Sequence, residues 1–342
     1  MIFGAGLSAV FGFAACGSVS NKSDAGSGGA VGSGGDTGSG GATGGGGTIA
    51  DASSDASVVA CDLTKPFGTP ALVTSLNTGF VEIDVWLTDD SRTAYVASTR
   101  TDLGGPGGND IYVASRASAT GDFGAMSLLA NVNSASADRR PVLSPDRLTL
   151  FFSSNRPVGD GGTGTNIFVV TRPNALADFG TPGLLAAANS TATDFPDSVT
   201  ADGKLLYLDS ASGASRDIYV RDLTTSNPPT PVAELNSTNS DAFAVISHDG
   251  RTIYFASNRT SAARVDGGAP DAAARTDFDV WVAHRAAATG AFSNLAPVPE
   301  LNSTSEDAPN WLSPDGCTIY LSSDRNAPSG SRHIWAASKP AN

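Results

Sequence analysis

The sequence predicts an all-β protein: a five-bladed β-propeller of four-stranded blades, in which an N-terminal strand completes the last blade. Three observations favour this fold class. One unit recurs five times along the chain, each copy contains short β-branched and aromatic runs separated by turn residues, and no comparable helical period appears. Four-stranded units of about 55 residues are typical of propeller blades.

The repeat is defined by four positions at fixed spacing. Each copy starts with an asparagine, followed by a carboxylate five residues later, an aspartate eight residues after that, and an aromatic residue five further on. The asparagines are Asn77, Asn133, Asn189, Asn236 and Asn302, the carboxylates Glu82, Asp138, Asp194, Asp241 and Asp307, the aspartates Asp90, Asp146, Asp202, Asp249 and Asp315, and the aromatic residues Tyr95, Phe151, Tyr207, Tyr254 and Tyr320. Fixed spacing over five copies indicates a repeat architecture.

Each copy predicts the same order of elements: strand, tight turn, strand, loop, strand and a last short strand. Asp249-Gly250 is typical of the tight turn, because these residue types tolerate positive φ. Runs such as 218–220 predict the third strand, and short apolar runs such as 232–235 predict the fourth. The last copy stops after its third strand, and residues 72–76 match a fourth strand. We therefore expect the N-terminal strand to complete the last blade.

Two segments carry a resemblance to a known family. Residues 143–146 with 153–156 and residues 312–316 with 322–325 resemble the WD-like propeller repeats of TolB-type proteins, and the likeness extends over residues 66–342. The resemblance implies a propeller that serves as an interaction platform. TolB-like domains usually have six blades, so a six-bladed ring is the alternative to the five copies counted here.

The N-terminus predicts an export signal and a tether. Residues 1–15 are uncharged and mostly apolar but too short to cross a bilayer, as in a signal-peptide h-region. Residues 13–17 resemble a bacterial lipobox, which implies that Cys16 is lipidated. An ordinary cleaved signal and a cytoplasmic protein are the alternatives. Residues 16–60 then form a disordered, Gly/Ser-rich tether, and residues 61–342 form the propeller.

The resemblance to lipoproteins also predicts a location. Ser18 stands where an aspartate retains many lipoproteins in the inner membrane, which implies an outer-membrane lipoprotein on the periplasmic or outer surface. In the expected ring, Cys61 and Cys317 lie on the same face of the last blade. An exported protein with two cysteines so placed is expected to form a disulfide, and two free thiols are the alternative.

The net charge of the chain limits the classes of partner that it can bind. The chain has 34 acidic and 21 basic residues, a formal net charge of -13. Nucleic acid and an anionic bilayer would be repelled over most of such a surface. We therefore expect no nucleic-acid partner, and membrane contact only through the N-terminal lipid.

The repeated carboxylates Glu82, Asp138, Asp194, Asp241 and Asp307 have two interpretations. They open the innermost strand of each blade, so they would circle the mouth of the central channel and could hold a cation such as calcium. Alternatively, each accepts hydrogen bonds from its adjoining turn or pairs with an arginine. Arg100 with Asp110, Arg156 with Asn166 and Arg259 with Asp279 are expected to bridge the ends of the loop between the second and third strands.

Trp86 and Trp311 occupy equivalent places in the first strand of their copies. They belong either to the core or to a channel-facing pair that stacks on a sugar ring.

The sequence predicts no catalytic residues, metal ligands or cofactor. The three histidines are scattered, no cysteine pair has zinc spacing, and no Gly-x-Ser-x-Gly motif occurs. Residues 159–164 have the letters of a dinucleotide fingerprint, but that motif requires a strand before it and a helix after it. A strand is expected to follow, so the segment is interpreted as a hairpin loop.

These observations predict a monomeric, non-enzymatic scaffold in the cell envelope. It would bind a protein partner through loops of unequal length, at about 99–110, 156–166, 211–217 and 259–278. One alternative is a carbohydrate-binding propeller. A less favoured one is a five-bladed glycosidase, which needs two carboxylates about 5 to 9.5 Å apart in different environments.

Overall fold

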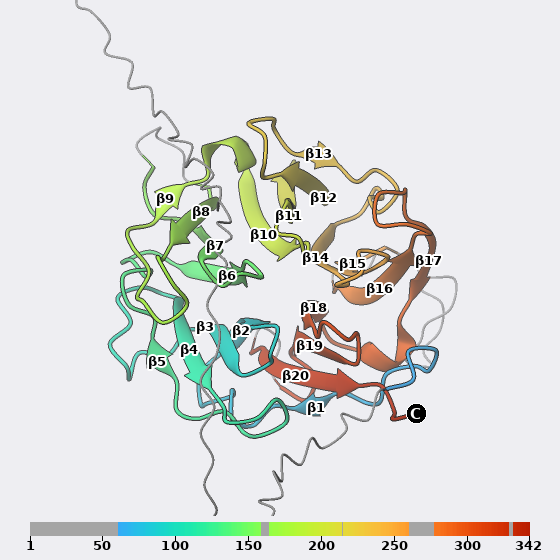
Figure 1. Ribbon diagram of the computed structural model, residues 1–342, viewed down its shortest axis with the longest axis horizontal. Coiled ribbons are helices and arrows are strands. Elements are labelled where there is room, and N and C mark those ends of the chain that lie inside the picture. Colours follow the sequence, from blue (N-terminus) through green and yellow to red (C-terminus); the bar gives the residue numbers. More distant parts are fainter. Residues whose placement is uncertain (1–60, 159–163, 214, 260–276, 328–330) are drawn as a thin grey trace, which may run out of the picture. The chain divides into compact units, whose positions relative to one another are not determined.

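The computed structural model describes residues 61–158, 164–213, 215–259, 277–327 and 331–342, which form five four-stranded antiparallel blades around an axis (Figure 1). The predicted all-β, five-bladed fold is confirmed, and the six-bladed alternative is wrong for the described part of the chain. The predicted h-region, Cys16 and the tether lie outside the described residues.

The strands follow the predicted order within each blade. Blade 1 contains β2 (Glu82–Leu87), β3 (Thr93–Ser98), β4 (Asp110–Ser115) and β5 (Ser127–Leu128); blade 2 contains β6 (Asp138–Leu143), β7 (Thr149–Ser154), β8 (Asn166–Thr171) and β9 (Gly183–Leu184); blade 3 contains β10 (Thr193–Val199), β11 (Leu205–Ser212), β12 (Ser215–Asp222) and β13 (Thr230–Pro231); blade 4 contains β14 (Asp241–Ile246), β15 (Thr252–Ser257), β16 (Asp279–His284) and β17 (Ser293–Pro297). Blade 5 contains β18 (Asp307–Leu312), β19 (Thr318–Ser323), β20 (His333–Ser338) and β1 (Ala71–Leu72). The first strand of each blade lies nearest the axis (Figure 1).

Helix is confined to two single 3₁₀ turns in the described residues, η1 (Ala186–Ala188) and η2 (Pro299–Leu301). None of the helices in this part of the chain is long and apolar enough to cross a membrane.

The repeated aspartate closes the tight turn between the first two strands. Asp249 Oδ1 accepts hydrogen bonds from Ser247 Oγ at 2.6 Å and from the Arg251 amide at 3.0 Å. Gly250 follows with φ of 69°, a backbone conformation that glycine adopts without strain. The same pair of bonds, from a Ser or Thr hydroxyl and from the amide two residues on, recurs at Asp90, Asp146, Asp202 and Asp315.

The repeated asparagine joins neighbouring blades. Asn133 accepts a hydrogen bond from the Ile111 amide at 2.7 Å and donates one to the Ile111 carbonyl at 2.9 Å. Ile111 belongs to β4, so the residue that leads into blade 2 is paired with the third strand of blade 1. Asn77, Asn189, Asn236 and Asn302 make the same two bonds to Ile334, Ile167, Ile218 and Val280, which completes the ring.

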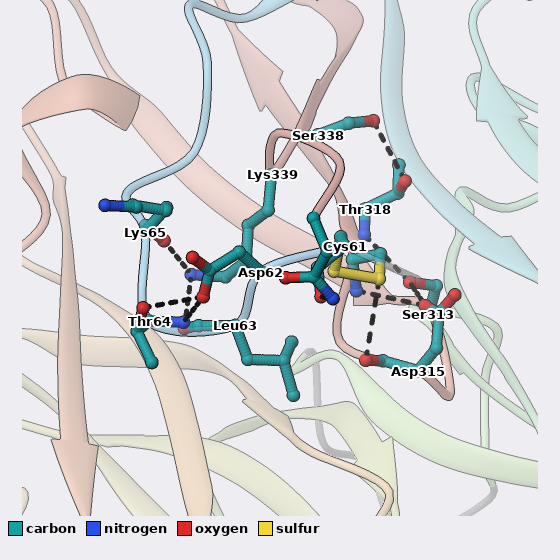
Figure 2. Close-up of a disulfide and its surroundings, with 12 residues drawn as sticks. Cys61, Asp62, Leu63, Thr64, Lys65, Ser313, Asp315, Thr318, Ser338 and Lys339 are labelled. Carbon is teal, nitrogen blue, oxygen red and sulfur yellow. Dashed lines mark hydrogen bonds between the residues drawn. A yellow bond between two sulfur atoms is a disulfide. The ribbon is translucent and has the colours of Figure 1, made fainter. Parts of the chain in front are cut away.

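The N-terminal strand completes blade 5, as predicted. In the antiparallel pairing of β1 with β20, Ala71 lies opposite Ala336 and Leu72 opposite Trp335. Upstream of β1, Cys61 is joined to Cys317 by a disulfide with a Cα–Cα distance of 5.7 Å (Figure 2). The N-terminal segment is therefore held to its blade by strand pairing and by a covalent bond.

Removing the disulfide should destabilise the protein through its unfolded state. The bond joins residues 256 positions apart, and a loop of that length is worth up to about 5 kcal/mol in the chain-entropy model. We expect the double variant Cys61→Ser/Cys317→Ser to unfold at lower urea concentration with circular dichroism still that of β-structure. Dithiothreitol should destabilise the wild type and leave the double variant unchanged. Equal stability of wild type and variant would contradict this role.

Candidate functional site

The repeated carboxylates are fully buried within their blades. Asp138 is 0% exposed, and its Oδ2 accepts hydrogen bonds from the Ser134 amide at 2.7 Å and from Ser134 Oγ at 3.0 Å. Its Oδ1 accepts a hydrogen bond from Arg156 Nη2 at 2.6 Å. Both oxygens are thus taken by donors of the same blade, as in the alternative in which these carboxylates serve the blade.

The other repeated carboxylates have the same surroundings. Glu82, Asp194, Asp241 and Asp307 are each 0% exposed and bond to the hydroxyl of the Ser or Thr four residues earlier. Arg259 and Arg325 pair with the carboxylates of their blades, Asp241 and Asp307. The described residues contain no group of three or more His, Cys, Asp or Glu side chains that could hold a metal ion. The carboxylates therefore do not form an open ring at the channel mouth.

The bridges predicted across the loop between the second and third strands of each blade are not formed. Arg156 and Arg259 turn back to the carboxylates of the innermost strand, Asp138 and Asp241. Arg100 pairs with Asp102, at 2.9 Å within the loop. The physical reason is burial, because the carboxylates of Asp138 and Asp241 are 0% exposed and require a counter-charge or several donors.

Bulges in the innermost strands direct other side chains to the axis. The strand register shifts between Arg139 and Val142 in β6 and between Ala242 and Val245 in β14. Inside these bulges Arg140 has φ of 48° and Phe243 has φ of 55°. Bulges re-aim side chains, and here the residues within them line a small cavity on the axis.

A cluster of five charged residues occupies this part of the propeller. Arg140 Nη1 donates hydrogen bonds to Asp197 Oδ1 at 2.8 Å and to Asp209 Oδ2. Arg140 Nε also lies 3.9 Å from Asp84 Oδ1, and a second arginine, Arg216, pairs with Asp209. Three carboxylates and two guanidinium groups therefore share one buried network, which we call the axial cluster.

Two phenylalanine rings cover the guanidinium groups of the axial cluster. The Arg140 guanidinium carbon lies 3.5 Å from the Phe243 ring centre and 4.5 Å from that of Phe195, and the Arg216 guanidinium carbon lies 4.3 Å from the Phe195 ring centre. Rings in this position attract the cations and exclude water from them. The charges are thereby desolvated, so the free energy of ionising one group depends on the charge of the others.

Asp197 and Asp209 have opposite pKa shifts. Burial, together with the negative charge of Asp209, raises the pKa of Asp197 well above its usual range. Burial also acts to raise the pKa of Asp209, but the charges of Arg140 and Arg216 outweigh it and lower that pKa. Asp197 is therefore the more easily protonated of the two, and Asp209 is the counter-charge that pairs with both guanidinium groups.

The axial cluster closes the centre of the propeller. The cavity beside it measures about 20 Å³, which is room for about one water molecule. Carboxylates with split pKa values suit acid–base chemistry, but the side chains of Asp197 and Asp209 are 0% exposed. A substrate the size of a sugar has no room beside them in this structure.

Trp86 and Trp311 lie in the core. They are 9% and 3% exposed and contribute to the largest hydrophobic cluster around blades 1 and 2. Trp311 packs edge-on against Tyr320, with ring centroids 5.7 Å apart. Both also line an apolar hollow of about 40 Å³ on the propeller. Their positions fit the core interpretation, because neither indole presents an open face on which a sugar ring could stack.

The axial cluster could not be predicted from the repeat. Asp84 and Arg140 stand at the same place in their copies, two residues after the repeated carboxylate, but the other copies have Pro196, Phe243 and Pro309 there, so a search for recurring residues passes over this position. A signal is nevertheless present: Arg140 and Asp197 fall within strands that are otherwise buried. A charged residue inside a buried strand requires a partner of opposite charge.

Comparison with known proteins yields similar folds only. No protein-family description matches the chain, and no curated protein matches it. A TolB-type protein structure from Agrobacterium tumefaciens is 16% identical, with a TM-score of 0.47, and the match covers 76% of this chain and 79% of that one. For TolB from Acinetobacter baumannii the identity is 16% and the TM-score 0.43, with 78% of this chain and 57% of that one covered.

Glycoside hydrolases are similar to the same degree. The catalytic domain of an α-L-arabinofuranosidase from Coprinopsis cinerea is 14% identical with a TM-score of 0.43, and the match covers 80% of this chain and 95% of that one. Because the similar structures include both TolB proteins and enzymes at such low identity, they do not distinguish a binding propeller from an enzyme.

The protonation of Asp197 generates a testable difference between two conservative variants. We expect Asp209→Asn to lower the free energy of unfolding by about 3 to 5 kcal/mol, because two buried guanidinium groups lose their shared counter-charge. Asp197→Asn should instead raise the free energy of unfolding at pH 7, because the amide resembles the protonated acid and, unlike the acid, takes up no proton on folding. Urea unfolding of both variants at pH 7 checks this, and equal losses would show that Asp197 is ionised.

The pH dependence has a definite sign. An acid whose pKa is raised on folding binds more protons folded than unfolded, so its contribution to stability falls as pH rises above the unfolded pKa. The stability of the wild type relative to Asp197→Asn should therefore fall above about pH 4, by up to about 1.4 kcal/mol per pH unit, until the pH reaches the pKa of Asp197 in the folded protein. A pH-independent difference would contradict this assignment.

Proposed function

We propose that this protein is a non-enzymatic binding propeller of the cell envelope, which engages a protein partner through one face. The observation that carries the proposal is the contrast between its two faces. The loops between second and third strands range from two residues (213–214) to twenty-one (258–278), with 99–109, 155–165 and 324–332 between these extremes. We call this the loop face. Loops 258–278, 155–165 and 324–332 lie partly outside the described residues.

The opposite face varies less, since its loops between third and fourth strands, at 116–126, 172–182, 223–229 and 285–292, have seven to eleven residues. Its turns between first and second strands, at 88–92, 144–148, 200–204, 247–251 and 313–317, all have five residues and the same aspartate geometry. A face that repeats one turn five times serves the fold, whereas unequal loops on a rigid scaffold are where binding residues concentrate. The closed axis supports the same assignment, because it leaves the rim as the accessible surface.

Loop 99–109 is held in a fixed conformation. The Tyr112 hydroxyl donates a hydrogen bond to the Arg100 carbonyl at 2.8 Å, and the Gly107 amide donates one to Asp110 Oδ2 at 3.1 Å. A Cβ atom on Gly107 would lie 2.1 Å from the Ser136 carbonyl oxygen, so the loop packs closely against the lead-in to blade 2. Leu103 is 38% exposed on this loop. A preformed loop loses little conformational entropy when it binds.

Lipidation of Cys16 and attachment to the outer membrane belong to the same proposal. The residues that support them are the apolar segment 1–15, the lipobox-like residues 13–17 and the Gly/Ser-rich segment that follows. In this arrangement the propeller is a monomer that contacts the membrane only through its lipid, and the tether gives the loop face access to its partner.

The loop face can be tested with two exposed leucines on opposite faces. Leu103→Asp should abolish crosslinked recovery of a near-stoichiometric partner from the envelope of the native host, because a carboxylate would be desolvated in the interface. Leu176 is 98% exposed in the loop between β8 and β9, at the other end of the strands. Leu176→Asp is therefore the matched control and should retain the partner. Loss with Leu176→Asp alone would assign binding to the wrong face.

The anchor makes a separate prediction. Cys16→Ala should move the protein from the membrane fraction to the soluble fraction, because the chain loses its lipid and none of the helices among its described residues could span a membrane. The double variant Cys61→Ser/Cys317→Ser retains Cys16 and should stay in the membrane fraction. Fractionation and labelling with a fatty-acid analogue measure both outcomes, and an unchanged distribution of Cys16→Ala would refute the anchor.

A further inference from the structure

A cavity of about 590 Å³ lies between blades 4 and 5, away from the axis. Residues of β15, β16 and β17 form one side, and the N-terminal segment Leu63–Phe67 forms part of the other. Its volume lies within the range of 300–1,000 Å³ found for small-molecule sites. None of the proposed loop-face interactions uses this cavity.

The wall of the cavity is anchored at both ends. The Cys61–Cys317 disulfide fixes the start of the N-terminal segment, and Lys339 Nζ donates hydrogen bonds to the carbonyls of Lys65 at 2.6 Å and Leu63 at 3.3 Å (Figure 2). Further along, the Phe67 amide donates to Glu300 Oε1 at 3.1 Å. The cavity is therefore preformed, which reduces the entropy lost when a ligand binds.

Lys339 distinguishes this boundary from the one between blades 1 and 2, where a cavity of about 330 Å³ is lined by Arg172. In blades 1, 2 and 4 the residue after the third strand is an arginine, which lies on a phenylalanine of its own blade and donates to a carbonyl of the adjacent turn; these arginines are Arg116, Arg172 and Arg285. Lys339 occupies this place in blade 5 and lies 4.5 Å from the Phe67 ring centre. It bonds to the N-terminal segment instead, and so its charge turns away from blade 4.

The side chain of Tyr254 lines the cavity without a hydrogen-bond partner for its hydroxyl among the described residues. It is 8% exposed and packs edge-on against Phe67, with ring centroids 5.8 Å apart. Tyr95, at the same place in blade 1, accepts a hydrogen bond from Arg172 Nη2 of the next blade at 3.4 Å. Blade 5 offers Tyr254 no arginine.

The Tyr254 hydroxyl can donate a hydrogen bond into the cavity. Burial of the side chain, together with the charge of Glu300, raises the pKa of Tyr254 to about 12, so the phenol is protonated at neutral pH. Since the hydroxyl borders the cavity and has no partner among the described residues, a ligand oxygen can accept from it there. The atom of the ligand that faces Tyr254 should therefore be a carbonyl or hydroxyl oxygen.

The rest of the lining indicates a neutral ligand with an apolar portion. Charged groups around the cavity nearly balance, with Lys65 and Lys339 against Asp249, Glu300 and Asp315. Val282, Val298 and Leu312 supply apolar contacts, and the carboxylates can accept from ligand hydroxyls. A sugar with an acetamido group combines hydroxyl donors, a carbonyl acceptor and a methyl group in one ring.

We propose that the cavity between blades 4 and 5 binds a short neutral saccharide containing N-acetylhexosamine, whose acetamide carbonyl accepts the Tyr254 hydroxyl. The acetamide methyl packs against the valine side chains, and ring hydroxyls donate to the acidic side chains. The ligand is recognised at the side of the propeller, so the loop face remains available to a protein partner.

Calorimetric titration of the full chain with triacetylchitotriose tests the proposal. Tyr254→Phe removes only the hydroxyl and should weaken binding about three- to tenfold, as expected for one lost hydrogen bond. Tyr95→Phe is the matched control, because it removes the equivalent hydroxyl from the boundary occupied by Arg172, and its affinity should equal that of the wild type. Pro299→Trp, at an exposed residue of the cavity, should block binding.

Cellotriose supplies the second arm, because it has the hydroxyl groups but lacks the acetamide. It should bind to the wild type more weakly than triacetylchitotriose does. Its affinity should be the same for the wild type and for Tyr254→Phe. The proposal is overturned if triacetylchitotriose does not bind at millimolar concentration, if Tyr254→Phe and Tyr95→Phe bind equally, or if the two saccharides bind alike. Circular dichroism of each variant verifies that the propeller is folded.

Discussion

The propeller depends on one side-chain pairing that is repeated around the ring. Each repeat asparagine makes two hydrogen bonds to one residue in the third strand of the preceding blade, so it extends that strand's hydrogen bonding across the blade boundary. An amide side chain can do this because it carries a donor and an acceptor side by side, as a peptide group does. A carboxylate could accept from the backbone amide but could not donate to the backbone carbonyl, which is in keeping with an asparagine at the start of all five copies.

The parts of the structure that could be predicted are those that every blade needs. Asn133, Asp138 and Asp249 can be predicted because each makes a contact that every blade needs, and five copies reveal their spacing. The partner of Arg156 was mistaken, because sequence proximity suggested the near end of its loop while burial of Asp138 determined the contact. The axial cluster and the open cavity depend on residues that differ between blades, for which repetition carries no information.

The axial cluster and the cavity between blades 4 and 5 are both formed by residues that differ from blade to blade. The bulged inner strands bring a cation, two carboxylates and an aromatic ring to the axis, where they neutralise one another and fill the space. At the boundary of blades 4 and 5, Lys339 stands where three other blades have an arginine, and the Tyr254 hydroxyl lines the cavity without a partner among the described residues. The same fold thus presents different groups at equivalent blade boundaries by changing single residues.

The disulfide also determines how the protein would respond to mechanical load. A pulling force on the chain before Cys61 passes through the sulfur bridge to Cys317, next to β19, before it reaches β1. The two-residue strand β1 would separate easily under tension, since it has few hydrogen bonds to β20. With the bridge intact, tension is applied to the central strands of blade 5 and the closing strand is shielded from it.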